Sequence, residues 1–162
     1  MSAQPRGTLS WILPELAKAL RIGEADVREY FTDGRRVSFL LERRIAHEVI
    51  KGRLAPTEGA GYDLIDPEGL KWEVRSITES TGIYFCPSYM VGKGRKFDKP
   101  GFLTKLEDIA GYIVSDIESF PDIPFWILPK DLVRAWWDSG KLGVNSSVSR
   151  KKALALLANW QS

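Results

Sequence analysis

Two carboxylates and a guanidinium lie close together in the stretch Glu58–Ser76, EGAGYDLIDPEGLKWEVRS. Asp63 precedes and Glu73 follows the segment Asp66–Gly69, in which Pro presets φ and Gly tolerates a positive φ, as tight turns require. A turn centred near Glu68 would place the two acids opposite each other on antiparallel strands, with Cβ atoms about 5 Å apart. Because carboxylates at that distance repel unless a cation neutralises them, the pair predicts a divalent metal site.

The alternation of side chains along the second strand decides which residues join the two acids. Residues two apart on a strand share a face, so Lys71, Glu73 and Arg75 point one way. Trp72 and Val74 point the other way. Arg75 is therefore expected beside the carboxylates. The alternative is an exposed turn whose charges are only solvated.

The order of these residues resembles the PD-(D/E)xK nuclease superfamily, in particular the small PvuII-like type II restriction endonucleases. There an Asp opens one strand and an acid-x-Lys triplet lies on the next; the matching positions are Asp63 and Glu73-Val74-Arg75. The stretch Pro124–Lys141 is similar to the strand and helix that follow in such enzymes. Tyr62 stands where the family has Pro, and Arg75 where it has Lys. Arg cannot exchange a proton as Lys can, so Arg75 is expected to position water or to stabilise charge in the transition state.

The resemblance implies a Mg²⁺-dependent endodeoxyribonuclease that cleaves double-stranded DNA, as a sequence-specific type II restriction enzyme. Asp63 and Glu73 would hold Mg²⁺, or Mn²⁺ in its place, with help from the carbonyl of Val74. In the family a helix Glu often completes the site, and Glu48 is the candidate, with Glu58 as another additional acid; Glu48 could equally be a solvated residue at the rim of its helix. An enzyme that cuts both strands is expected to act as a two-fold homodimer.

Two other functions stay open. The replacement of Lys by Arg75 fits a non-catalytic nucleic-acid-binding module on the same fold. A DNA repair or junction nuclease would share the chemistry but recognise the shape of its substrate. The presence of both Asp63 and Glu73 favours an enzyme over the binding module, because a decayed site would be free to lose either acid.

Cations and aromatic rings are grouped in the irregular segment 88–100, in a chain whose net charge is only +2. Loops of this length in compact domains are usually functional or mobile, and such a composition suits contacts with phosphates and base edges. The residues expected to contact DNA are Ser88, Tyr89, Lys93, Arg95, Lys96 and Lys99. Other basic clusters are Arg35-Arg36, Arg43-Arg44 and Arg150-Lys151-Lys152. A solvated surface loop is the alternative for 88–100.

Composition restricts the class of protein further. The chain has 162 residues, of which 44% are hydrophobic and 27% charged, as in soluble single-domain proteins. No apolar run approaches ~18 residues, so no membrane span is expected. One cysteine, Cys86, fits a reducing compartment, and a cytoplasmic location is expected. One histidine, His47, excludes metal sites that need two imidazoles.

Hydrophobic periodicity predicts helices first, then mostly strands, then helices again. We expect N-terminal helices over 9–52, the catalytic hairpin and sheet over 58–128, and C-terminal helices over 129–160, in a single nuclease-like domain spanning 1–162. The β-branched stretch Ile109–Ile117 is expected to be a central strand, and residues 1–8 a disordered lead. This order predicts an α/β (α+β) domain with a mixed central β-sheet flanked by helices, like that of the restriction endonucleases.

Overall fold

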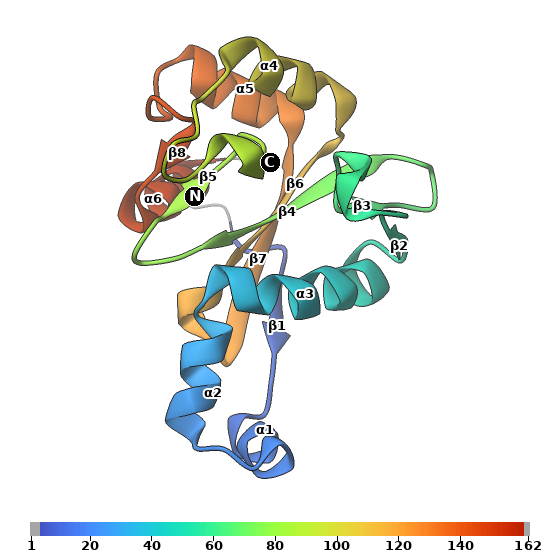
Figure 1. Cartoon of the computed structure of the whole chain (residues 1–162), viewed down its shortest axis with the longest axis vertical. Coiled ribbons are helices and arrows are strands. Elements are labelled where there is room, and N and C mark those ends of the chain that lie inside the picture. Colours follow the sequence, from blue (N-terminus) through green and yellow to red (C-terminus); the bar gives the residue numbers. More distant parts are fainter. Residues whose placement is uncertain (1–3, 161–162) are drawn as a thin grey trace.

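A mixed six-stranded sheet forms the centre of the computed structural model, which describes residues 4–160 (Figure 1). Its strand order is β1-β7-β6-β4-β3-β2. The strands are β1 (Gly7–Ser10), β2 (Arg53–Leu54), β3 (Leu64–Ile65), β4 (Lys71–Ile77), β6 (Gly111–Asp116) and β7 (Asp122–Pro129). β4 and β6 run parallel, and the other neighbouring pairs are antiparallel. The expected mixed α/β fold class is confirmed.

Helices cover both faces of this sheet (Figure 1). On one side lie α1 (Leu13–Leu20), α2 (Glu24–Phe31) and α3 (Gly34–Arg44), which continues into a π-helical turn, η1 (Ile45–Val49). On the other side lie α4 (Lys99–Asp108), α5 (Lys130–Asp138) and α6 (Arg150–Asn159). Each side has its own apolar core, and alternate residues of β6 serve both: Tyr112 and Val114 pack toward α4–α6, and Ile113 packs toward α3. No helix within 4–160 has the length and apolar character that crossing a membrane requires.

The central position of the predicted strand 109–117 is confirmed, because every residue of β6 is buried. The prediction of a disordered lead over 1–8 is wrong for its described end. Gly7–Ser10 form β1, which pairs with β7. Leu9 opposes Ile123 in that ladder and is 2% exposed, so burial of one apolar side chain accompanies the pairing. Residues 1–3 of the lead lie outside the described residues.

The C-terminal half of β4 borders open space instead of another strand. β3 pairs only with Lys71 and Trp72, whereas β6 pairs with β4 as far as Ile77. The chain then turns through a bridge between Thr78 and Gly82 into β5 (Ile83–Tyr84). β5 leaves the main sheet and pairs with β8 (Ser147–Val148). This divergence exposes one edge of β4 to a cleft.

An ion-pair network fastens α6 to the ends of β4 and β6. Arg150 donates from Nε and Nη2 to the two carboxylate oxygens of Asp116, at 3.0 and 2.9 Å. Its Nη1 lies 3.2 Å from Oε2 of Glu79, in the turn after β4. Because Asp116 is 2% exposed, it needs this cation. Arg150 is therefore engaged with carboxylates, although the sequence grouped it with the basic clusters suited to phosphate.

Removing this cation is expected to destabilise the fold. Arg150→Ala should lower the free energy of unfolding by about 3 kcal/mol, because a buried carboxylate is left unpaired. The control is Arg134→Ala, which breaks an exposed pair with Asp138 and should cost less than about 1 kcal/mol. Urea denaturation measures both values. Equal losses in the two variants would contradict the structural role of Arg150.

Candidate functional site

The predicted hairpin is present, and its register is the expected one. Leu64 pairs with Trp72 and Ile65 with Lys71, which centres the turn on Glu68. Asp66 shapes this turn, because its Oδ1 accepts the N–H groups of Glu68 and Leu70, both at 2.9 Å. The hairpin places Asp63 directly before β3 and Glu73 within β4.

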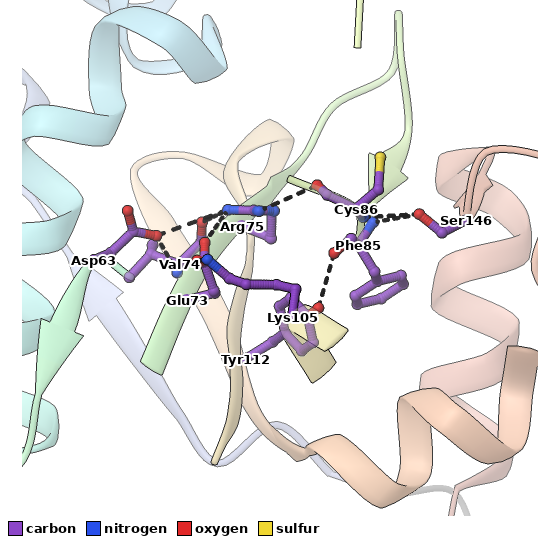
Figure 2. Close-up of polar contacts among 9 residues, drawn as sticks. All are labelled: Asp63, Glu73, Val74, Arg75, Phe85, Cys86, Lys105, Tyr112 and Ser146. Carbon is purple, nitrogen blue, oxygen red and sulfur yellow. Dashed lines mark hydrogen bonds and ion pairs between the residues drawn. The ribbon is translucent and has the colours of Figure 1, made fainter. Parts of the chain in front are cut away.

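One guanidinium nitrogen lies where the three expected metal ligands converge (Figure 2). Nη1 of Arg75 donates to Oε2 of Glu73 at 2.8 Å and to the carbonyl oxygen of Val74 at 3.0 Å. It also lies 3.7 Å from Oδ2 of Asp63. That same Asp63 oxygen accepts the N–H of Val74 at 2.8 Å. The structure therefore brings Asp63, Glu73 and Arg75 together, as the sequence predicts.

Contacts from beyond β5 fix the orientation of Arg75 (Figure 2). Its Nη2 donates to the carbonyl oxygen of Cys86 at 3.3 Å. The N–H of Cys86 in turn donates to Oγ of Ser146 at 2.8 Å, and the hydroxyl of Tyr112 donates to the carbonyl of Phe85 at 2.8 Å. The Arg75 side chain is only 12% exposed. Its guanidinium is thus held against the acids by the backbone that follows β5, which Ser146 and Tyr112 hold in turn.

Lys105 is a site residue that the sequence does not indicate. It projects from α4, and its Nζ forms an ion pair with Oε1 of Glu73 (Figure 2). The two side chains are 14% and 6% exposed, so the pair is shielded from water. Each oxygen of Glu73 therefore has its own cation, Arg75 on one and Lys105 on the other. No local spacing in the sequence predicts this contact.

The acid of α3 that lines the cleft beside Asp63 is Glu42, and the expected Glu48 does not line it. Glu42 lines the same cleft as Asp63, with Arg35 and Ser38 from the same face of α3. Glu48 lies in the π-helical turn, pairs with Arg44 at 3.0 Å and is absent from the cleft lining. The spacing of Arg35, Ser38 and Glu42 at i, i+3 and i+7 is the sequence signal that could have identified this face.

Glu58 begins a short 3₁₀ turn, η2 (Glu58–Ala60), and does not line the cleft either. The negative charge of Glu58 helps to raise the pKa of Glu42, although it contributes less than burial and the charge of Glu73 do. Neither Glu48 nor Glu58 therefore lines the cleft, whereas Glu42 lines it together with Asp63 and Arg75.

The pKa values of Asp63 and Glu73 are shifted in opposite directions. Burial, followed by repulsion from Glu73, raises the pKa of Asp63 to about 7. Burial acts to raise the pKa of Glu73 as well, but Arg75 and Lys105 outweigh it, so that pKa is lowered. Glu73 consequently carries the negative charge of the pair, while Asp63 exchanges its proton near neutral pH.

A cleft of about 1010 Å³ opens beside this cluster. Asp63, Val74 and Arg75 form part of its wall, α3 forms another part, and the turn between β4 and β5 a third. Of the six residues expected to contact DNA, Ser88 and Arg95 line the cleft. Tyr89, Lys93 and Lys96 are exposed in the same segment without lining it, and Lys99 begins α4.

The oxygen donors of the site fit a divalent cation only in part. Within 4–160, no three His, Cys, Asp or Glu side chains gather in a metal-binding arrangement. The available oxygens are those of Asp63, Glu73 and the Val74 carbonyl. This set suits Mg²⁺, which takes one or two protein carboxylates and completes its shell with water and phosphate oxygens. Arg75 competes with the ion, because its Nη1 already contacts all three groups.

Comparisons with known proteins do not assign a family. No protein-family model matches the chain, and no curated protein matches its sequence. Function must therefore be inferred from the geometry and chemistry of the site itself.

The raised pKa of Asp63 predicts a pH-dependent stability. Its pKa is about 7 in the folded chain against an ordinary 3.8, so the folded state binds more protons between these values. The stability from this group is complete below about pH 4 and declines as the pH rises to about 7. Asp63→Asn should remove that decline, so the variant should gain stability relative to wild type between about pH 5 and pH 8.

Urea denaturation at about pH 5 and at about pH 8 tests this expectation. Glu73 stays ionised across the range because its pKa is lowered, so it does not obscure the effect. Asn retains an oxygen that can accept the N–H of Val74. A stability difference that is the same at both pH values would contradict the raised pKa of Asp63.

Proposed function

We propose that the cleft is the active site of a Mg²⁺-dependent endodeoxyribonuclease, in which Mn²⁺ can replace Mg²⁺. The observation that carries this proposal is the convergence of Asp63, Glu73 and the Val74 carbonyl on one point beside an open cleft. Nη1 of Arg75 stands at this point and Lys105 pairs with the other oxygen of Glu73, and both cations are shielded from water. Oxygen ligands beside buried cations suit the binding of a phosphodiester.

Asp63, Glu73 and the Val74 carbonyl would hold the ion. When bound, Mg²⁺ lowers the pKa of a water molecule and neutralises developing negative charge on the phosphate. Asp63 must be ionised to serve as a ligand, so binding releases its proton and strengthens as the pH rises through about 7.

Arg75 and Lys105 have different capacities in this reaction. The guanidinium of Arg75 stays charged and can present two donors to the phosphate oxygens. The ammonium of Lys105 pairs with Oε1 of Glu73 and helps to lower the pKa of that carboxyl. Lys105 does not line the cleft, so its role would be to keep Glu73 charged and in place as a ligand.

A non-catalytic nucleic-acid-binding module is the second candidate, and one observation favours it. Nη1 of Arg75 itself contacts all three oxygen groups and neutralises them. A site neutralised in this way could persist as a purely structural element. Two predictions from the resemblance remain predictions: restriction-type cleavage of both strands and a two-fold homodimer. The alternative of a repair or junction nuclease also remains a prediction.

Incubation of plasmid with the protein and Mg²⁺, followed by a gel, tests the proposal. Discrete bands would indicate restriction and a smear non-specific cleavage, whereas intact plasmid would favour the binding module. Asp63→Asn and Glu73→Gln should each abolish cleavage. Gln is preferred to Ala at Glu73, because Ala would leave Arg75 and Lys105 without their carboxylate.

The matched control for these variants is Glu15→Gln, an exposed acid on α1 that should cleave at the wild-type rate. Circular dichroism should show that all three variants keep the fold. Cleavage at the wild-type rate by either site variant would refute the assignment of the ligands.

Substitutions of the two cations test the need for positive charge beside Glu73. Lys105→Ala leaves one oxygen of Glu73 without its cation and should lose rate on the order of 100-fold, whereas Lys105→Arg keeps the charge and should keep most of the rate. Arg75→Lys should keep most of the rate, because positive charge suffices there. Single-turnover rates measure these effects, with Lys18→Ala on α1 as the control. An equal loss in Lys105→Arg and Lys105→Ala would show that positive charge at this position is not sufficient.

A further inference from the structure

Only two aromatic side chains are exposed within 4–160, and each directly follows a residue that lines the cleft, although neither lines it itself. Phe39 is 57% exposed on α3, and Tyr89 is 63% exposed in the 3₁₀ turn η3 (Ser88–Met90). All other Phe, Tyr and Trp side chains in that range are at least partly buried. An exposed ring offers a face on which a planar ligand can stack.

The first ring is surrounded by cations of α3. Arg35 and Arg43 lie one helical turn before and after Phe39, and the guanidinium carbon of Arg43 is 3.4 Å from the ring centroid. Neither arginine has a carboxylate within 4.0 Å in the described chain. Arg35 and Ser38 line the cleft, and Phe39 lies beside them on α3, outside the lining and exposed at the rim.

The second ring has a similar environment on the facing segment. Tyr89 stands between Ser88 and Met90, which both line the cleft. Arg95 also lines it, and its Nη1 donates to the carbonyl of Ser88 at 3.1 Å. Lys93, Arg95 and Lys96 are exposed, and the ion pairs of residues 4–160 include none of them. Within that range, each rim of the cleft thus has one exposed ring near cations that form no ion pair, and at Phe39 one of these cations, Arg43, already lies over the ring.

We propose that the cleft binds an unpaired strand of DNA, whose bases stack on Phe39 and Tyr89 and whose phosphates contact the cations of the two rims. This inference rests on the proposed function, since the strand would be the substrate. Aromatic rings stack on any base whose face is free, whatever the sequence. In an uninterrupted duplex the neighbouring bases cover those faces, so the two rings would gain no stacking. The geometry therefore points to single-stranded or junction-containing DNA as the preferred ligand.

Fluorescence anisotropy with labelled DNA in EDTA tests this preference, because binding is then measured without cleavage. A single-stranded oligonucleotide should bind more tightly than the duplex of the same sequence. Phe39→Ala and Tyr89→Ala should each weaken single-strand binding by about tenfold, with an unchanged dependence on salt. Leu20→Ala, which removes a side chain equally exposed at 57% on α1, should have no effect.

Substitution of the cations should instead change how strongly DNA binding depends on salt. Replacing Lys93, Arg95 and Lys96 by Gln should reduce the log–log salt slope by about 0.7 for each phosphate of the single strand that the variant no longer neutralises. Arg35→Gln and Arg43→Gln should do the same on the other rim.

The outcomes separate this inference from the proposed function. Duplex binding as tight as single-strand binding, or unchanged affinity in both aromatic variants, would overturn the stacking role and leave the nuclease proposal standing. Absence of DNA binding by the wild-type protein would overturn both. Circular dichroism of each variant distinguishes weakened binding from unfolding, and the exposed positions of both rings favour folded variants.

Discussion

The buried carboxylate of Glu73 is the constraint on which the site depends. It is 4% exposed, and a charge so removed from water requires partners of opposite sign. Arg75 comes from its own strand and Lys105 from α4, so the requirement ties the hairpin to the opposite face of the sheet. Burial, together with this same negative charge, raises the pKa of Asp63 to about 7. The burial of Glu73, the pKa of Asp63 and the packing of α4 against the hairpin therefore depend on one another.

Arg75 gives the site two possible states. In the described state its guanidinium satisfies the oxygens of Asp63, Glu73 and Val74. A divalent cation would displace it from the acids, and the freed donors could then turn toward a phosphate in the cleft that Arg75 also lines. Under the proposed function, loading of the ion and engagement of the substrate would be linked through this one side chain. The binding-module alternative retains only the first state.

Local signals account for what could be predicted from the sequence. Asp66–Gly69 contains the residues that a tight turn needs, and the turn determines the register that brings Asp63 toward Glu73. The β-branched run of β6 likewise specifies a buried central strand. Lys105 could not be predicted, because its pairing depends on how α4 packs against the sheet. Glu42 was not predicted, because Glu48 also lies at the rim of a predicted helix. The structure places Glu48 in a π-helical turn beyond the cleft.

The wall of the cleft depends on residues that follow α5 in the sequence. Ser146 holds the backbone that orients Arg75, and Arg150 fastens the turn after β4. During synthesis the helices α1–α3 and the hairpin leave the ribosome before either residue does. A nascent chain that has reached only α5 therefore has its acids but lacks the supports for its arginine. The order of translation delays completion of the cleft until the segment containing Ser146 and Arg150 has emerged.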